Sequence, residues 1–329
     1  MTEPDIKKFR DKYIGKLTIK EPYSRTKFLS VRVRGYIDLF RGFTLIAPFV
    51  VAMSMMVASI VLKINNGETL DSNWWITAIY ASGTVAIVNA ASNALNQATD
   101  FEADKISKPY RPIPRNVVKP DEAQSLAYLL YLFALIRAAT IKPWFGIFIF
   151  LIMIFTITYS LPPRMKKYLF INQIWIAIPR GMLGILAAWS VFGDPFTPTP
   201  LIIGAIATTY LIGGMATKDI LDSVADKQTG THTLINTYGI KKTALICFPF
   251  MFFPFAFIPI FINRGLLANY LLPLSFLVIV IFLIIYYMIK TTESKTLENT
   301  YAWLSVHILY IIYAMGFSLL TIFNKVLPF

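Results

Sequence analysis

Residues 96–114 read NQATDFEADKISKPYRPIP and follow directly on an apolar stretch of the chain. Within them, Asn96, Asp100 and Asp104 recur at four-residue intervals, so on a helix their side chains share one face. Four basic residues come next: Lys105, Lys108, Arg111 and Arg115. Acids clustered beside bases indicate a site where a metal ion bridges the protein to an anion.

A second string of the same kind occurs 122 residues later, since DFEADK at 100–105 is echoed by DSVADK at 222–227. It belongs to KDILDSVADK, which contributes Asp219, Asp222 and Asp226. A charged side chain inside a membrane costs about 2.5–3.5 kcal/mol on insertion scales, so carboxylates near membrane ends need partners. Carboxylate and amide oxygens suit Mg²⁺, and the sequence has no His/Cys cluster that would favour zinc. We therefore predict one magnesium site built from two halves.

The composition places the chain in a membrane. Of 329 residues, 56% are hydrophobic and 15% charged, and the mean hydropathy is +0.59. A soluble domain of this size cannot bury so much apolar surface, which indicates a polytopic membrane protein with the lipid bilayer as partner. The net charge of +13 comes from basic residues between apolar segments. This pattern is typical of membrane topology and anionic lipid rather than of nucleic-acid binding. A single cysteine, Cys247, excludes a disulfide framework.

The apolar pattern predicts two regions. Residues 1–35 hold ten Lys/Arg against four Asp/Glu and have no signal-peptide core. We interpret them as a cytoplasmic arm, amphipathic or partly disordered, on the membrane surface, the alternative being a solvated tail without a specific role. Residues 36–329 form an all-α transmembrane domain, with two pseudo-repeats of four helices plus one. Its nine predicted spans are 36–62, 73–97, 121–140, 144–161, 170–192, 200–221, 241–263, 269–289 and 300–324.

The distribution of basic residues predicts the orientation. With the N-terminus in the cytoplasm, the inner segments carry 23 Lys/Arg. The outer segments carry four: Lys63, Lys142, Arg264 and Lys325. By the positive-inside rule this favours a multi-pass protein of the cell membrane with its N-terminus and both aspartate strings facing the cytoplasm.

Several basic residues are candidates for anion binding. Arg111 lies in YRPIP, where two prolines stiffen the loop and fix a guanidinium suited to bidentate phosphate recognition. Lys218 directly precedes Asp219 and could reach either that acid or a phosphate. Asn172 and Arg180 lie eight residues apart on one predicted helix, with Arg180 about 15 Å from its cytoplasmic end, and we predict both as substrate-binding residues. Because a charged side chain at that depth is costly in contact with lipid, we expect Arg180 to line a cavity.

Taken together, these motifs resemble the UbiA superfamily of intramembrane prenyltransferases. They are NxxxDxxxD followed by KPYRPIP, and KDxxDxxxD late in the chain. YSLPPRMK at 159–166 resembles the tyrosine–diproline loop of that superfamily, and residues 39–48 resemble the start of its first helix. The resemblance runs from about residue 36 to the C-terminus. It implies nine helices around a central cavity that opens on the cytoplasmic side.

The resemblance also implies roles for individual residues. The protein would bind Mg²⁺ next to the diphosphate of an isoprenoid donor, and Asp219 would support the residues that ligate the metal. Those ligands would be Asn96, Asp100, Asp104, Asp222 and Asp226. The diphosphate would be bound by Lys105, Arg111 and Lys218, with Arg41 as a further candidate. The donor would ionise to an allylic cation that a lipophilic acceptor captures, and Tyr159 would stabilise that cation through its ring or simply pack.

The acceptor is less constrained than the donor. The string DxExDKxxKPYRPIP with KDIxD is most similar to the digeranylgeranylglyceryl phosphate synthases, which join geranylgeranyl diphosphate to geranylgeranylglyceryl phosphate in ether-lipid synthesis. Chlorophyll synthases and homogentisate prenyltransferases share much of the loop, so aromatic quinone precursors and tetrapyrroles remain alternatives. Three departures from the pattern, Gln97, Asn116 and Ala225, weaken the acceptor assignment but leave the metal ligands intact. Arg164, Lys166 and Lys167 fit either a phosphate-bearing acceptor or positive-inside anchoring.

A different class of function is a lipid transporter or flippase, which would also use two repeats and a basic cavity. Transport does not require acids at four-residue spacing in both repeats, which favours the enzyme. A CDP-alcohol phosphotransferase is disfavoured because its DGxxAR opening is absent near both strings. The sequence identifies no protein partner.

Overall fold

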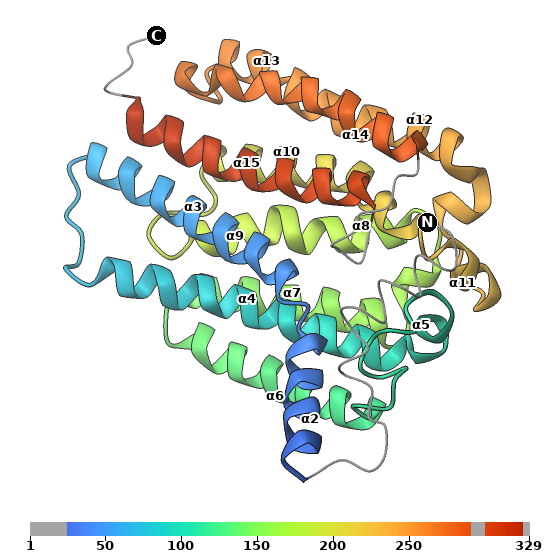
Figure 1. The fold of residues 1–329 in the computed structure, drawn as a ribbon. Coiled ribbons are helices and arrows are strands. Elements are labelled where there is room, and N and C mark those ends of the chain that lie inside the picture. The colour runs from blue at the N-terminus through green and yellow to red at the C-terminus, as the bar shows by residue number, and fades with distance from the viewer. Residues whose placement is uncertain (1–24, 291–299, 325–329) are drawn as a thin grey trace.

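The computed structural model describes residues 25–290 and 300–324, which form helices and turns without a β-strand. The long helices run side by side as a bundle (Figure 1). In chain order the α-helices are α2 (Arg25–Leu39), α3 (Phe43–Asn65), α4 (Trp74–Thr99), α5 (Phe101–Ser107), α6 (Pro120–Ala139), α7 (Pro143–Ser160), α8 (Ile171–Ile178), α9 (Gly184–Trp189), α10 (Pro198–Gly214), α11 (Ser223–Gln228), α12 (Leu234–Ala256), α13 (Ile258–Asn263), α14 (Val278–Lys290) and α15 (Tyr301–Phe323). Met165–Lys167, Met215–Asp219 and Asn269–Leu277 are 3₁₀-helical, and Pro179–Leu183 is a π-helical turn.

Eight helical segments in the described part of the chain are long and apolar enough to cross a membrane. They are Phe43–Asn65, Trp74–Thr99, Pro143–Ser160, Ile171–Trp189, Pro198–Asp219, Leu234–Asn263, Asn269–Lys290 and Tyr301–Phe323. The remaining predicted span, 121–140, forms α6, which is less apolar because Asp121, Glu122 and Arg137 lie near its ends. The all-α membrane fold is therefore confirmed, whereas the count of nine spans is not.

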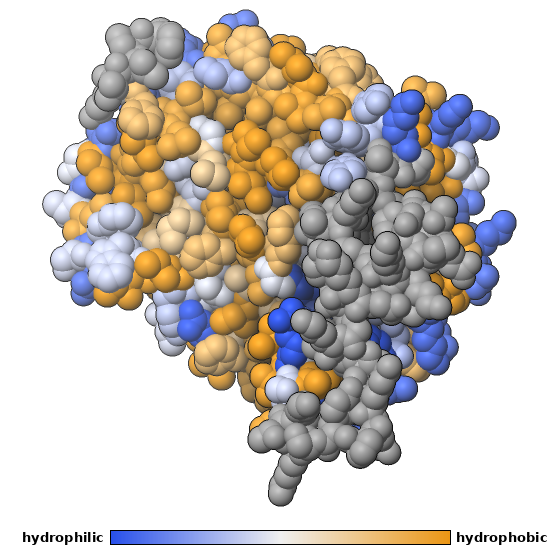
Figure 2. Space-filling view, viewed as in Figure 1, coloured by the Kyte–Doolittle hydropathy of each residue, from blue (hydrophilic) through white to orange (hydrophobic). Residues whose placement is uncertain are grey.

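The outer surface of the bundle is apolar, and Figure 2 shows hydrophobic residues over most of one face with hydrophilic ones toward its ends. Large apolar side chains are exposed on the long helices, among them Leu245 at 75%, Phe276 at 67% and Leu129 of α6 at 65%. So extensive an apolar surface would be unfavourable in water, but it contacts lipid tails in a membrane. The exposed apolar face of α6 indicates that this helix also faces lipid.

The first predicted span, 36–62, is wrong at its start, because the chain breaks between α2 and α3. Arg41 adopts a left-handed conformation with φ 52°. The carbonyl groups that the break frees accept hydrogen bonds from side chains of α4: Gln97 Nε2 donates to Leu39 at 2.7 Å and Asn93 Nδ2 to Phe40 at 2.9 Å. These distant contacts fix a bend that the local apolar pattern does not indicate. Residues 1–24 of the predicted arm lie outside the described residues, so the division at residue 35 stays a prediction.

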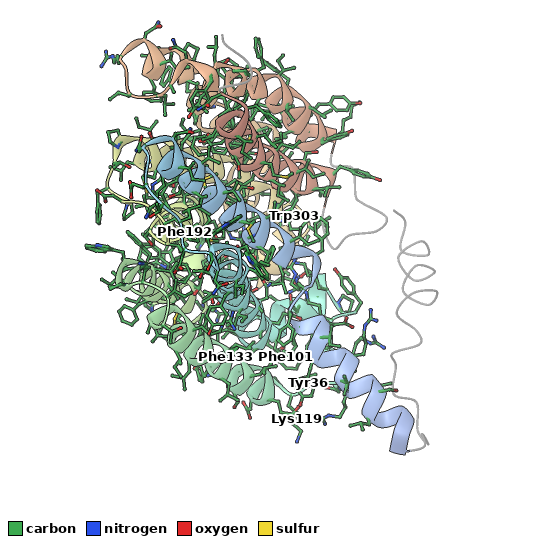
Figure 3. The ribbon with its side chains drawn as sticks, turned by 90° about the vertical axis from the view of Figure 1, so that its left-hand side faces the viewer. Tyr36, Phe101, Lys119, Phe133, Phe192 and Trp303 are labelled. Atoms are coloured by element: carbon green, nitrogen blue, oxygen red, sulfur yellow. The ribbon has the colours of Figure 1, made fainter. Side chains whose placement is uncertain are left out.

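Helix α2 runs across the direction of α3 and reaches the start of α6 (Figure 1). Arg32 Nη2 lies 2.8 Å from Glu122 Oε2, and the Tyr36 hydroxyl donates to the same oxygen at 3.2 Å. Figure 3 shows Tyr36 beside Lys119, the residue that precedes α6. A charged contact between segments about 90 residues apart therefore ties α2 to the bundle.

The predicted span 170–192 is interrupted at Pro179, where α8 passes into the π-helical turn and then into α9. Two neighbouring helices satisfy the polar backbone groups of this turn. The amide of Met182 donates to Thr208 Oγ1 of α10 at 2.7 Å, and the Tyr310 hydroxyl of α15 donates to the Arg180 carbonyl at 2.6 Å. Such partners are what a proline break requires inside a membrane. The turn is thus fixed against both helices, and with it the position of Arg180.

We predict that Gly181→Ala destabilises the protein by roughly 1–3 kcal/mol, because overpacking displaces backbone or side chains. A Cβ at this position would lie 2.7 Å from the backbone nitrogen of Thr208. Thermal unfolding in detergent measures the loss. Gly146→Ala is the matched control, since its Cβ would meet its nearest atoms at an ordinary 3.7 Å. Equal melting temperatures for the two variants would contradict the close approach of the π-helical turn to α10.

Candidate active site

The two aspartate strings have the same local geometry. In the first, Asp100 (φ −99°, ψ 14°) separates α4 from α5, and the Asp104 amide donates to the Asp100 carbonyl at 2.8 Å. In the second, Asp222 (φ −87°, ψ −6°) precedes α11, and the Asp226 amide donates to the Asp222 carbonyl at 2.8 Å. Each first aspartate thus stands at the start of a short helix and each second one in its first turn. α5 packs against α11 at one end of the bundle (Figure 1).

A polar cavity of about 240 Å³ lies between these strings. It is lined by 12 of the 13 site residues that the sequence predicts. Six of them carry carboxylate or amide groups of the two strings: Asn96, Asp100, Asp104, Asp219, Asp222 and Asp226. The other six are Arg41, Arg111, Tyr159, Asn172, Arg180 and Lys218. Residues distant in sequence therefore converge, as the two-half site requires.

Lys105 is the exception. Its ammonium lies 3.0 Å from Glu102 Oε1 and 3.8 Å from the centre of the Phe101 ring, on the exposed side of α5. It follows Asp104 by one residue, which turns its side chain about 100° away around the helix. The structure does not bring Lys105 to the cavity.

Three basic residues without an assigned site role do line the cavity: Lys108, Arg164 and Lys166. The sequence left their role open, because positive-inside anchoring explains the same residues. For Lys108 a signal existed, since it follows Asp104 by four residues and so continues the face of Asn96, Asp100 and Asp104. Arg164 and Lys166 reach the cavity on the loop between α7 and α8, whose path no local pattern indicates.

In the first string each acid is paired with basic groups. Asp100 accepts from Lys166, from Arg164 Nη2 at 3.0 Å and from Asn96 Nδ2 at 2.8 Å. Asp104 accepts two hydrogen bonds from Arg111 Nη1, at 2.8 and 3.0 Å, and the side chains of this pair are 5% and 4% exposed. The loop that contains the two prolines therefore folds back so that Arg111 contacts Asp104, seven residues earlier in the chain.

In the second string the pairing is less complete. Lys108 crosses from the first string to Asp222, and Lys218 pairs with its neighbour Asp219. Asp219 also lies 3.3 Å from Asn172 Nδ2 and 3.4 Å from Gln173 Nε2, both from α8. Asp226 has no ion pair within the residues that the structure describes.

The pKa values follow from this pairing. Burial and the nearby Asp219 and Asp222 raise the pKa of Asp226 to about 7, despite Lys218 and Lys108. Burial also raises the pKa of Asp104, although Arg111 opposes it. For Asp100 the effect of burial is outweighed by Lys166 and Arg164, which hold its pKa below the usual range. Asp226, which also lacks an ion pair among the described residues, is therefore an acid whose negative charge the protein compensates poorly.

The donor chemistry of the cavity fits a hard divalent cation. Its carboxylate and amide oxygens are the ligands that Mg²⁺ prefers. Within residues 25–290 and 300–324, however, no three His, Cys, Asp or Glu side chains converge closely enough to hold an ion. Basic side chains stand between the carboxylates, so Mg²⁺ would have to replace them. The lysines and arginines displaced in this way would face the cavity, where they could bind an anion.

The polar cavity adjoins an apolar one of about 170 Å³. Val51, Val85 and Phe155 are among the apolar residues that line it. The two cavities share several polar residues: Arg41, Asn96, Tyr159, Arg180, Lys218 and His307. The Tyr159 hydroxyl donates to Asn172 Oδ1 at 3.1 Å, and the ammonium groups of Lys166 and Lys218 each lie 5.9 Å from its ring centre. The arrangement suits a ligand with an anionic head and an apolar chain.

An all-α membrane bundle with two facing aspartate strings is the architecture of the intramembrane prenyltransferases. The chain belongs to the UbiA prenyltransferase family, whose model matches residues 43–322. It is therefore a prenyltransferase and a multi-pass membrane protein, and the lipid transporter alternative is set aside.

Within the family, the chain is similar to several individual proteins in sequence or in fold. The chain is 26% identical over 268 residues to the digeranylgeranylglyceryl phosphate synthase of Methanobrevibacter smithii, covering 80% of this chain and 93% of the relative. It is 25% identical over 287 residues to the synthase of the same name from Methanosphaera stadtmanae, covering 85% and 98%. Its fold is similar to that of a UbiA homologue from Archaeoglobus fulgidus solved with DMAPP and Mg²⁺ bound (TM-score 0.64, 17% identity, covering 86% of this chain and 98% of that one).

We predict that Arg111→Gln lowers the free energy of unfolding by roughly 3–5 kcal/mol, because it leaves a buried carboxylate unpaired. Adding Asp104→Asn removes that charge, so the double variant should recover much of the lost stability. Thermal unfolding of the metal-free protein in detergent completes a double-mutant cycle. Additive effects of the two substitutions would show that the pair is not coupled as described.

Proposed function

We propose that this prenyltransferase transfers a geranylgeranyl group from geranylgeranyl diphosphate to geranylgeranylglyceryl phosphate in ether-lipid synthesis. The observation that carries the reaction type is the polar cavity between two aspartate strings, which opens into an apolar cavity. The acceptor is supported by two digeranylgeranylglyceryl phosphate synthases that align with 80% or more of the chain. Aromatic quinone precursors and tetrapyrroles are the competing acceptors.

The proposed metal ligands are the amide and carboxylates of the two strings, with Asp219 in support. They are Asn96, Asp100, Asp104, Asp222 and Asp226. Mg²⁺ bound there would neutralise the charge that develops on the diphosphate as it leaves. The Archaeoglobus fulgidus homologue solved with DMAPP and Mg²⁺ supports this proposal.

The basic side chains that now hold the carboxylates would bind the diphosphate oxygens instead. Arg111 offers a planar fork for two oxygens, and Lys218 offers a compact charge beside the second string. The diphosphate-binding group is completed by Lys108, Arg164 and Lys166. After this exchange of partners Mg²⁺ would compensate the carboxylates, and the diphosphate would compensate the lysines and arginines.

The chemistry then requires a leaving group, a cation and a nucleophile. The bond between the allylic carbon and the diphosphate oxygen breaks, and the electron pair leaves with the diphosphate. The Tyr159 ring, at the boundary of the two cavities, would face the resulting allylic cation. The acceptor hydroxyl oxygen forms the new ether bond, and its proton passes to the released diphosphate. Apolar walls keep water from capturing the cation first.

We propose that the cavity opens to the cytoplasm. The end of the bundle with α5 and α11 is the end at which the basic segments 98–121 and 161–169 lie, and the positive-inside rule places such segments in the cytoplasm. A charged prenyl diphosphate would then enter the site without crossing the membrane.

The acceptor is tested with a panel of compounds. Purified protein is supplied with geranylgeranyl diphosphate, Mg²⁺ and one acceptor: geranylgeranylglyceryl phosphate, an aromatic acid or a tetrapyrrole. Prenyl transfer and diphosphate release are measured together. We expect the fastest transfer to the glycerol phosphate. Faster transfer to an aromatic acid or a tetrapyrrole would reject the proposed acceptor while leaving the family reaction intact.

We predict that Asp100→Ala and Asp226→Ala each lower the rate of prenyl transfer by roughly 100-fold or more, the scale on which loss of a group stabilising a transition-state charge acts. Direct titration with Mg²⁺ should show weaker binding in both variants. Asp71→Asn serves as control, since Asp71 is exposed in the loop between α3 and α4 at the opposite end of α4 from Asp100. A near-normal rate in either alanine variant would refute the metal assignment.

A further inference from the structure

Arg180 lies apart from the ion pairs of the aspartate strings. It stands in the π-helical turn within the membrane span Ile171–Trp189 and lines both cavities. No acid pairs with it among the described residues. A guanidinium inside a membrane is costly unless its charge is compensated, so such residues usually serve a ligand or an ion path.

The position of Arg180 is fixed at its backbone and at its guanidinium. The Tyr310 hydroxyl donates to its carbonyl at 2.6 Å, and its Nη1 lies 3.5 Å from Nε2 of His307. Nδ1 of His307 lies 2.9 Å from the Trp303 carbonyl. A carbonyl only accepts, so Nδ1 carries the proton and Nε2 is left to accept from Arg180. A neutral imidazole thus orients the guanidinium and leaves its other N–H groups for a ligand.

The imidazole is itself held in place. Its ring lies 4.1 Å from the Trp303 ring, centre to centre, and the histidine is 6% exposed. Figure 3 shows Trp303 at the helix α15, which thereby contributes Trp303, His307 and Tyr310 to the support of one arginine. Two contacts to Arg180 from one helix, with Trp303 holding one of the two contacting residues, indicate a built site rather than an arginine that has snorkelled to the surface.

The location of this site separates it from the diphosphate-binding group. Four of the ion-paired bases, Lys108, Arg111, Arg164 and Lys166, line only the polar cavity. Lys218 also reaches the apolar cavity but is paired with Asp219, whereas Arg180 lies at the boundary without an ion pair among the described residues. An anionic group bound to Arg180 would therefore have its apolar chain in the second cavity and its reacting end toward the first. Arg41 lines the same boundary and adds positive charge there.

We propose that Arg180, positioned by His307, binds the phosphate of the acceptor lipid. This inference rests on the proposed function and adds to it the residue that distinguishes a phosphate-bearing acceptor from a neutral alcohol. The chemistry recognised is a phosphate monoester, which a lipid head group and free inorganic phosphate both present. The apolar cavity beside Arg180 favours the lipid.

The kinetic experiment compares wild type with Arg180→Gln and Arg180→Lys, varying donor and acceptor separately. Loss of a charged hydrogen bond predicts that Arg180→Gln raises the KM for geranylgeranylglyceryl phosphate roughly 10- to 100-fold and leaves the KM for geranylgeranyl diphosphate unchanged. Arg180→Lys should recover part of the loss, because it keeps the charge without the fork. An equal rise in both KM values would overturn the proposal.

Arg137→Gln is the matched control. It also removes an arginine from a helix of the bundle, but Arg137 donates to Thr84 Oγ1 at 3.0 Å and to the Tyr80 carbonyl at 2.9 Å, away from both cavities. Neither KM should change in this variant. His307→Ala should raise only the KM for the acceptor, and less than Arg180→Gln does. A rise in the donor KM with His307→Ala would contradict its role in positioning Arg180.

A binding experiment without turnover keeps the test independent of the reaction. Wild type in detergent should bind geranylgeranylglyceryl phosphate at least about 10-fold more tightly than neutral geranylgeranylglycerol, and Arg180→Gln should remove this difference. Inorganic phosphate should compete only weakly. Competition by inorganic phosphate as strong as by the lipid would overturn the lipid assignment.

The two proposals fail in different ways. If wild type binds the phosphate lipid through Arg180 but transfers no prenyl group to it, the proposed function is wrong and the anion site stands. If wild type transfers the group and Arg180→Gln keeps the same preference for phosphate over neutral lipid, the anion site is wrong and the proposed function stands.

Discussion

The ion pair between Lys108 and Asp222 joins the two halves of the site. The rest of the cavity depends on the same constraint, which is that a buried carboxylate needs a compensating positive charge. Carboxylates near a membrane are costly without a compensating charge, and for Asp100, Asp104 and Asp222 that charge comes from a loop or from the other string. Each loop beside the cavity therefore folds back onto an acid: the YRPIP loop brings Arg111 to Asp104, and the loop after α7 brings Arg164 to Asp100. The paired charges hold the two short helices, α5 and α11, at the same end of the bundle.

The apolar segments of the sequence predicted most of the fold, because the thickness and apolarity of the membrane determine the length and composition of the helices that cross it. The predicted span 144–161 corresponds to Pro143–Ser160, and the predicted span 300–324 to Tyr301–Phe323. The break at Arg41 was missed because Asn93 and Gln97, some 50 residues later, stabilise it. In the site, spacing predicted the convergence of Asn96, Asp100 and Asp104. Spacing could not show that the chain path brings Lys166 into the cavity, and Lys105, to which the resemblance gives a role, is not among the residues that line it.

The irregular turn at Pro179 connects the packing of the bundle to its chemistry. Proline ends the regular hydrogen bonding of the helix, and Thr208 and Tyr310 from two other helices take over the freed groups. The same contacts determine where the next residue, Arg180, projects. A close approach of Gly181 to α10 completes the arrangement. Backbone irregularity is tolerated at membrane depth where protein surrounds it or where it lines a cavity, and both conditions hold here.

The lining of the polar cavity also has an electrostatic consequence for ligand entry. It contains seven lysines and arginines and six aspartates and glutamates, so its formal charge is close to balanced. A lone dication or a lone polyanion would upset that electroneutrality in a low-dielectric space, whereas the two together nearly preserve it. Each would then act as the counterion of the other, and their affinities would be thermodynamically linked, each raising the other by the same factor.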